Sequence, residues 1–217
     1  MNAVVLSDLH IGNRYFISEP LKGFLESLPP QAELILNGDT VDRRRFKAEP
    51  QYSESLELIA RESRVRRVVW VRGNHDWKYM PPDAGKIEFA AHYEIGKRLF
   101  ISHGHKFDFI MLVAKPLLNL VRMVHDYRVD LGAERAHVAF AAKKFEGLYR
   151  VLRRHVALSA VNFARKNGYE AITCGHTHYV EDLMIGGIRY INTGSWTEPP
   201  ISYILVNDAG IELRRIH

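Results

Sequence analysis

The stretch AVVLSDLH, residues 3–10, joins a run of small and β-branched apolar residues directly to an acid and a histidine. Such a run predicts a buried strand that ends near Ser7. Asp8 and His10 are two positions apart, so they point to the same side of an extended chain. The same change from apolar run to polar cluster recurs at residues 34–42, 68–76, 99–105 and 171–178. The sequence therefore predicts five buried strands, each followed by polar side chains capable of chemistry.

Helix-forming stretches between these strands indicate an α/β layered fold. Residues 19–28 and 53–63 have helical composition and plausible caps. In open α/β sheets the ligand site lies outside the carboxyl ends of the strands, which is where all five polar clusters fall. Residues 188–191, 203–206 and 211–213 are predicted as three further strands. This meander-like end favours a pair of packed sheets over a single open sheet.

The residue pattern changes between residues 108 and 165, where long predicted helices replace short predicted strands. We predict one domain, residues 1–217, with a helical insertion at about residues 108–165 that forms a cap or lid. The insertion carries ten Lys and Arg and five Asp and Glu, so its net charge is +5, the same as the net charge of the whole chain. This charge suggests an anionic partner, and a solvated helix face explains it equally well. An apolar helical insertion could instead form a dimer surface, so the oligomeric state stays open.

The composition excludes several classes of protein. The 217 residues are 47% hydrophobic and 25% charged, which is typical of a globular chain and not of a disordered one. A single cysteine, Cys174, excludes an internal disulfide framework and zinc sites built from several cysteines. No run of eighteen apolar residues occurs, and Asp8 comes too early for a signal peptide. We therefore expect a soluble, cytoplasmic protein.

The polar clusters combine carboxylate oxygen, amide oxygen and imidazole nitrogen, a mixture that suits manganese, iron, zinc or cobalt. The residues that contribute them are Asp8, His10, Asp39, Asn74, His103, His176 and His178. Seven ligands are too many for one closed site and about right for two ions that share a bridging carboxylate. Two ions about 3.5–4 Å apart can hold the attacking and leaving oxygens of phosphoryl displacement. A water that bridges them loses its proton near neutral pH and becomes a hydroxide nucleophile.

The order of the motifs resembles that of the calcineurin-like metallophosphoesterase superfamily: D-x-H, G-D-x-x-D, G-N-H-D, H and G-H-x-H. They stand here at residues 8–10, 38–42, 73–76, 103 and 175–178. The resemblance implies a four-layer α-β-β-α sandwich. It also implies that the first ion is held by Asp8, His10, Asp39 and His178. Asp39 would bridge to the second ion, whose remaining ligands would be Asn74, His103 and His176.

The resemblance implies roles for neighbours of these ligands as well. His75 corresponds to the general acid or phosphate donor, with its imidazole oriented by Asp42. Arg43 follows Asp42 as in the Ser/Thr phosphatase pattern, where this arginine holds a phosphate oxygen; an exposed basic turn is the alternative, because two more arginines follow. Lys106 and Asp108, just past His103, are further candidates for contact with the substrate or with the ligand residues. Trp77 is expected to pack beneath the site, with stacking on a base or sugar as the alternative.

Within the superfamily, the bacterial branch around UDP-2,3-diacylglucosamine pyrophosphatase is most similar. The likeness rests on SDLHIG at residues 7–12, the early His103-Gly104 pair, the helical insertion, and NTGSW at residues 192–196. It implies manganese, with iron or zinc as alternatives, a nucleotide-sugar lipid as substrate, and peripheral contact with the inner membrane. Two departures point to another phosphoester: His75 stands where that branch has Arg, and His105 where it has Asp.

Three functions remain open. The first is hydrolysis of a small-molecule phosphoester or diphosphate by two metal ions. The second is a nuclease or cyclic-nucleotide phosphodiesterase, favoured by the basic charge and disfavoured because no nucleic-acid module is recognisable. The third is a non-catalytic scaffold on the same fold. The complete set of ligand residues ranks the scaffold last.

Overall fold

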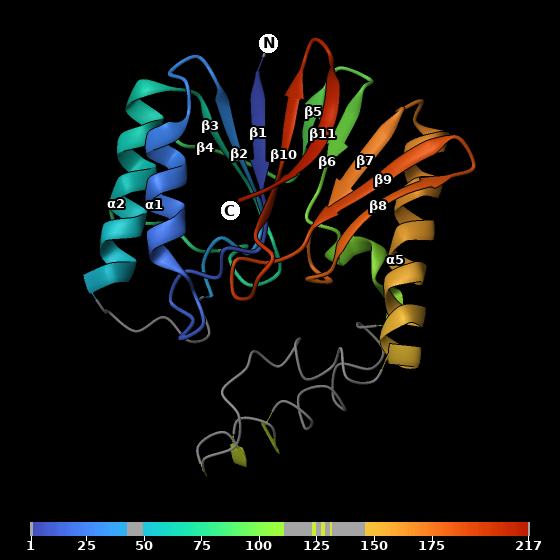
Figure 1. Cartoon of the computed structure of the whole chain (residues 1–217), viewed down its shortest axis with the longest axis horizontal. Helices are drawn as coiled ribbons and strands as arrows, with labels where there is room; N and C mark the ends of the chain where they lie inside the picture. The colour runs from blue at the N-terminus through green and yellow to red at the C-terminus, as the bar shows by residue number, and fades with distance from the viewer. Residues whose placement is uncertain are drawn as a thin grey trace.

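The computed structural model describes residues 2–42, 50–110, 123–124, 127–128, 131 and 146–216. Two β-sheets face each other, and helices cover their outer faces (Figure 1). The chain therefore has the four-layer α-β-β-α sandwich that the family resemblance implies.

The first sheet has six strands in the order β11-β10-β1-β2-β3-β4. Four of them are parallel: β1 (Ala3–Leu6), β2 (Glu33–Asn37), β3 (Val68–Val71) and β4 (Glu88–Ala90). The antiparallel pair at the other side is β10 (Ser202–Asn207) and β11 (Gly210–Arg215). The carboxyl ends of β1, β2 and β3 therefore lie at one edge of this sheet.

The second sheet has five strands in the order β5-β6-β7-β9-β8. Its parallel centre is β6 (Leu99–Ile101), β7 (Ala171–Cys174) and β9 (Ile188–Thr193). The antiparallel edges are β5 (Tyr93–Ile95) and β8 (Val180–Ile185). A 3-10 helix, η1 (His105–Phe107), follows soon after β6. The loops after β6 and β7 gather at the same end of the molecule as those after β1 and β2 (Figure 1).

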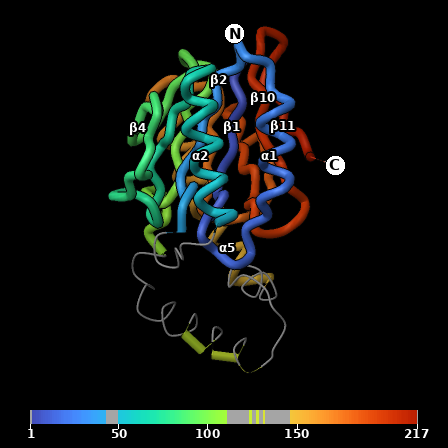
Figure 2. The backbone as a smooth tube through the Cα atoms, turned by 90° about the vertical axis from the view of Figure 1, so that its left-hand side faces the viewer, coloured from blue at the N-terminus to red at the C-terminus, as the bar shows by residue number. Residues whose placement is uncertain are grey.

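Each outer layer is a helix face packed on a sheet. The helices α1 (Ser18–Ser27) and α2 (Pro50–Val65) lie side by side on the first sheet (Figure 2) and bury Leu21, Phe24, Leu25, Leu56 and Ile59. The helix α5 (Glu146–Lys166) packs on the second sheet through Val156, Ala157, Ala160, Val161 and Ala164. Burial of each Val, Leu or Ile side chain contributes roughly 1.5–3 kcal/mol. None of the described helices combines the length and apolar character that crossing a membrane requires.

The layer between the sheets is apolar and closes the sandwich. It is built from inward-facing residues of both sheets, among them Val5, Ile35, Val69, Ile101 and Ile191. Because successive side chains of a strand alternate between faces, the same strands supply the layers beneath the helices. The central strands are consequently buried on both faces, which is why they are continuous apolar runs in the sequence.

The sequence located the central strands well and the edges poorly. The five predicted strands correspond to β1, β2, β3, β6 and β7, and the three late ones to β9, β10 and β11. The last three divide between the sheets, since β9 joins the second and the other two join the first. The predicted insertion overlaps α5, which the structure places on the second sheet. Most of the rest of that segment lies outside the described residues, so the lid stays a prediction.

Candidate metal centre

The loops that follow β1 and β2 run side by side and extend the pairing of the two strands. The backbone N–H of Asp8 donates to the carbonyl of Gly38 at 3.1 Å, and that of His10 donates to the carbonyl of Asp39 at 2.9 Å. A parallel bridge then joins Ile11 to Val41. These bonds hold the first two predicted motifs in a fixed register at the carboxyl edge of the sheet.

Five of the predicted ligands have their backbone in the left-handed region. The φ angles are 55° for Asp8, 53° for His10, 49° for Asp39, 65° for His176 and 53° for His178. Among the described residues, no other non-glycine residue has a positive φ. This conformation costs a residue with a Cβ roughly 1–2 kcal/mol, and such strain gathers at functional sites. The backbone itself thus marks these residues as a site.

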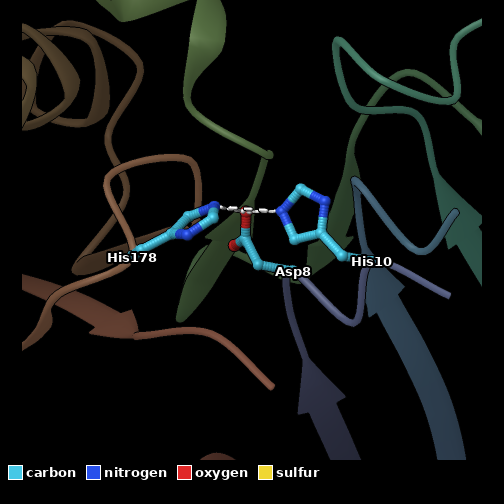
Figure 3. Close-up of side chains that lie close together, drawn as sticks. All are labelled: Asp8, His10 and His178. Atoms are coloured by element: carbon cyan, nitrogen blue, oxygen red, sulfur yellow. Dashed lines mark hydrogen bonds and ion pairs between the residues drawn. The ribbon is translucent and has the colours of Figure 1, made fainter. Parts of the chain in front are cut away.

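Asp8, His10 and His178 form the first group of potential ligands. Figure 3 shows the two imidazole rings turned toward each other at the carboxylate of Asp8. The Nε2 atoms of His10 and His178 are 3.0 Å apart, and Asp8 Oδ1 lies 3.2 Å from His178 Nε2 and 3.7 Å from His10 Nε2. All three side chains are buried. Two nitrogens and a carboxylate oxygen therefore converge on one small volume.

The charges of this group are strongly coupled. Burial alone would raise the pKa of Asp8, but the neighbouring His103 and His178 outweigh it and hold that pKa well below its usual range. Burial lowers the pKa of His178. The pKa of His10 is raised, because Asp8 and Asp39 outweigh the effect of burial. The opposite directions fit two facing nitrogens that can share at most one proton, and both nitrogens can accept a metal ion in its place.

Asp39, Asn74 and His103 form a second group beside the first. His103 Nε2 lies 3.1 Å from Asp39 Oδ2 and 3.2 Å from Asn74 Oδ1. The other ring nitrogen, Nδ1, is 3.0 Å from the carbonyl oxygen of Asn37 and must donate to it. This bond fixes the tautomer and leaves Nε2 facing the group. Against the effect of burial, Asp39 and Asp8 raise the pKa of His103 to about 10.

The carboxylate of Asp39 is aimed by the backbone. Its Oδ1 accepts the N–H of His75 at 2.7 Å, which leaves Oδ2 toward His103. Burial would raise the pKa of Asp39, but His103 and His75 lower it well below its usual range. The residue is therefore an anion between the two groups, where the sequence expected a bridging ligand.

His176 is turned differently from the other predicted ligands. Its backbone N–H donates to Asp8 Oδ2 at 3.0 Å, but its ring Nε2 lies 3.0 Å from Asp108 Oδ2. The ring centroid is 5.5 Å from that of His103. His176 thus stands at the border of the second group with one nitrogen already paired to a carboxylate.

The donor set fits two divalent cations. Three triads each bring one potential ligand atom per residue within 4.8 Å of the others: Asp8, His10 and His178; His10, Asp39 and His75; and Asp8, Asp39 and His103. The triads overlap, so one ion would leave donors unused. The mixture of imidazole and carboxylate suits manganese, iron or zinc.

His75 lies against this centre with a carboxylate behind it. Its Nδ1 is 3.0 Å from Asp42 Oδ1, and its Nε2 is 3.9 Å from Asp39 Oδ2. Burial would raise the pKa of Asp42, but the hydrogen bond and the charge of His75 outweigh it and hold that pKa well below its usual range. The amide of Asn13 donates to the other oxygen of Asp42 at 2.9 Å. Asn13 was missed by the sequence analysis, although it is buried and stands only three residues after the first motif.

Asp76, the last residue of the G-N-H-D motif, has a supporting role. Its carboxylate accepts three N–H groups, from the backbone of Gly73 at 2.7 Å, the backbone of Thr40 at 2.8 Å and the indole of Trp70 at 2.9 Å. Burial and the charge of Asp39 raise its pKa. The residue ties the turn that carries Asn74 and His75 to the neighbouring loop.

The glycines of the motifs allow close approach of loops. A Cβ on Gly73 would lie 2.1 Å from Asp39 Oδ1, and a Cβ on Gly175 would lie 2.0 Å from Asp8 Oδ2. No side chain fits at either position without displacing an aspartate of the centre. Glycine is therefore required there by space.

One predicted residue, Arg43, lies outside the described residues, and two others are exposed. Lys106 is exposed on η1. The expectation that Trp77 packs beneath the site is wrong: the residue is 60% exposed, and Lys78 Nζ lies over its ring, 4.2 Å from the centroid. The tryptophan that is buried near the ligand loops is Trp196, whose backbone N–H donates to the carbonyl of Asp8 at 3.0 Å.

Comparison with known proteins identifies a family and similar folds. A family model described as calcineurin-like phosphoesterase matches residues 1–180. A novel archaeal phosphodiesterase has a TM-score of 0.51 at 14% identity, over 100% of this chain and 99% of the other. The phosphoesterase YfcE from E. coli has a TM-score of 0.46 at 17% identity, over 96% and 89% of the two chains. Vps29 from Entamoeba histolytica, complexed with Zn²⁺, has a TM-score of 0.48 at 16% identity, over 100% and 98%. No curated protein sequence matches the chain.

Proposed function

The chain belongs to the calcineurin-like phosphoesterase family, and we propose that it is a hydrolase of phosphoester or diphosphate bonds that depends on two metal ions. The observation that carries the proposal is the convergence of three overlapping ligand triads at the carboxyl ends of strands from both sheets. A single structural ion would need only one triad. Two adjacent metal sites suit phosphoryl transfer, in which paired cations hold the attacking and leaving oxygens.

Each ion has its own set of residues in this proposal. Asp8, His10, Asp39 and His178 would hold the first, and Asp39, Asn74, His103 and His176 would hold the second. When bound, two divalent ions supply activation of a water molecule and polarisation of the phosphoryl oxygens. Manganese is the proposed metal, with iron and zinc as alternatives.

His75 is proposed to protonate the leaving oxygen. Asp42 is an anion at 3.0 Å from Nδ1, so it accepts a hydrogen bond from the N–H of that nitrogen, and Nε2 is left on the side of the metal centre. The side chain of His75 is 17% exposed, which lets a substrate reach it. A histidine held in this way contributes roughly 10²–10⁴-fold as a general acid.

A cavity beside the first group supports a substrate with an organic portion. It has a volume of about 270 Å³ and is bordered by His178, Tyr179, Ser195, Glu198 and Pro199. Glu198 and Arg215 put one charge of each sign on its wall, so the cavity as a whole does not select an anion. The cavity would therefore take the alcohol part of the ester while the phosphate lies over the metal ligands.

The finer proposal for the substrate is a nucleotide-sugar lipid of the UDP-2,3-diacylglucosamine type, hydrolysed in the cytoplasm or at the inner membrane. Large apolar side chains are exposed along one stretch of the chain: Phe109, Met123, Val124, Tyr127, Leu131, Leu148, Val151 and Leu158. Acyl chains would cover such a surface. Arg150 and Arg154 lie among them and offer charge for a diphosphate.

Phosphorus NMR of the manganese-loaded protein tests these proposals. The substrates are UDP-2,3-diacylglucosamine, p-nitrophenyl phosphate, bis-p-nitrophenyl phosphate, a cyclic nucleotide and a DNA oligonucleotide. Release of UMP from the lipid supports the finer proposal, while turnover of only the simple esters supports the metal hydrolase and removes the lipid. Preference for the nucleotides would favour the nuclease alternative. A protein that binds two ions and leaves every substrate intact would be a scaffold.

A further inference from the structure

The pairing of His176 with Asp108 has no part in the family motifs. Its geometry is nonetheless well defined: Nε2 and Oδ2 are 3.0 Å apart, and the side chains are only 9% and 3% exposed. A buried carboxylate that close to an imidazole accepts its N–H. Nε2 is therefore the protonated nitrogen, and Nδ1 is the nitrogen that remains for a ligand role.

His103 shows the same arrangement with the nitrogens exchanged. There Nδ1 donates to a backbone carbonyl, the oxygen of Asn37, and Nε2 faces Asp39. Histidines that bind metals commonly donate their other N–H to a carbonyl or a carboxylate, which sets the tautomer and increases the basicity of the ligating nitrogen. The two histidines assigned to the second ion would thus be held by two different kinds of partner.

We infer that Asp108 is the positioning residue of the second metal site, acting through His176. The inference rests on the proposed function, since it needs the second ion. Asp108 directly follows η1, and its backbone N–H donates to the carbonyl of His105 at 3.3 Å. The short helix therefore begins next to the ligand His103 and ends at the partner of the ligand His176. The segment from His103 to Asp108 thus contains one ligand of the second ion, His103, and the residue that orients another, His176.

Metal binding to three variants tests the inference without measuring turnover. Asp108→Ala removes the acceptor, Asp108→Asn keeps an oxygen but no charge, and Asp182→Ala is a control that removes an exposed carboxylate paired with Arg189 at 2.8 Å. Manganese per chain and the affinity of each site are measured by elemental analysis and calorimetry. We expect Asp108→Ala to weaken one of two sites by about 10–100-fold and Asp108→Asn to weaken it less, since loss of such a partner has that effect. The other site and the control should match the parent protein.

A residue with a merely structural role would give a different pattern. It would lower the melting temperature and weaken both sites alike, and that result overturns the inference. Unchanged affinity at both sites in Asp108→Ala overturns it too. If the alanine variant does not fold, the tautomer decides: long-range ¹H–¹⁵N spectra of the zinc-loaded parent protein should show His176 protonated at Nε2. Protonation at Nδ1 refutes the inference.

The outcomes that refute the role of Asp108 can be distinguished from those that refute the proposed function. A parent protein that binds two ions, shows the expected tautomer and hydrolyses no phosphoester would end the proposed activity and keep the role of Asp108. If the protein hydrolyses esters with two ions, and Asp108→Ala leaves the affinity of both sites unchanged, the proposed activity is supported and the role of Asp108 is refuted. A parent protein that binds no second ion overturns the inference.

Discussion

Replacing Gly73 by alanine should disable the metal centre, although the substitution adds only one methyl group. The new Cβ would lie 2.1 Å from Asp39 Oδ1 and 2.3 Å from the backbone nitrogen of Asp39, whereas ordinary contact begins at 3.4 Å. The carboxylate must therefore move by about 1.3 Å, which disturbs its contacts with His103 and with the backbone N–H of His75 that aims it. Overpacking of this kind costs roughly 1–3 kcal/mol of unfolding free energy, and a 1 Å misplacement at a reacting centre costs about 10²-fold in rate.

The assay compares this variant with Gly23→Ala, which adds the same methyl group where nothing lies within 4 Å, in the exposed face of α1. Urea unfolding, manganese content and turnover of bis-p-nitrophenyl phosphate are measured for both. Gly23→Ala should be stabilised by about 0.5–1 kcal/mol and keep full metal content. Gly73→Ala should lose metal and at least about 100-fold in turnover. A Gly73→Ala protein with both ions and the parent rate would refute the argument that Gly73 is required by space.

Three further predictions concern the same centre. Asp39→Ala should remove both ions and all turnover, because its carboxylate lies between the two groups; retention of one ion would contradict the bridging position. His75→Ala should keep both ions and lose about 10²–10⁴-fold in turnover of substrates with poor leaving groups, and equal loss with p-nitrophenyl leaving groups would argue against an acid. In metal-free protein the contributions of Asp42 and His103 to stability should both be present between pH 3.8 and 6.5, measured as the difference in urea midpoint between the parent protein and Asp42→Asn or His103→Gln. The contribution of Asp42, whose pKa is lowered, is complete above pH 3.8 and is lost as pH falls below it, while that of His103, whose pKa is raised, is complete below pH 6.5 and is lost as pH rises toward 10. Differences in midpoint that do not change with pH would contradict these shifts.

The buried central strands could be predicted because local and tertiary requirements coincide in them. Runs such as residues 3–6 and 171–174 are apolar throughout, since both faces of each strand are covered. The strands β4 and β5 have three residues each and are largely half-buried or exposed, so their sequences carry no such run. Strand β8 is likewise half-buried or exposed along its whole length. Such edges are defined by pairing with a neighbour, which a single sequence does not display.

The candidate ligands could be predicted for a different reason: each follows a central strand. The contacts that hold them in place could be predicted only in part, because the partners are distant in sequence. The position of Asp108 beside His103 made it a candidate for a supporting contact, but its partner His176 lies 68 positions away and could not be predicted. Asn13, which reaches Asp42 across 29 positions, was missed altogether. Trp77 shows the converse error, since an aromatic residue next to a motif was assumed to be buried and lies in solvent. Sequence motifs identify what touches a ligand, and the fold decides what supports it.

The left-handed backbone of the five ligand residues has a consequence for the protein in a cell. At roughly 1–2 kcal/mol each, their strain is a sizeable share of the 5–15 kcal/mol that keeps a domain folded. Bound ions stabilise the native state in proportion to the logarithm of their free concentration. Chains made during metal starvation would therefore unfold more often and be degraded by proteases sooner. The amount of this protein, and not only its activity, should follow the supply of its metal.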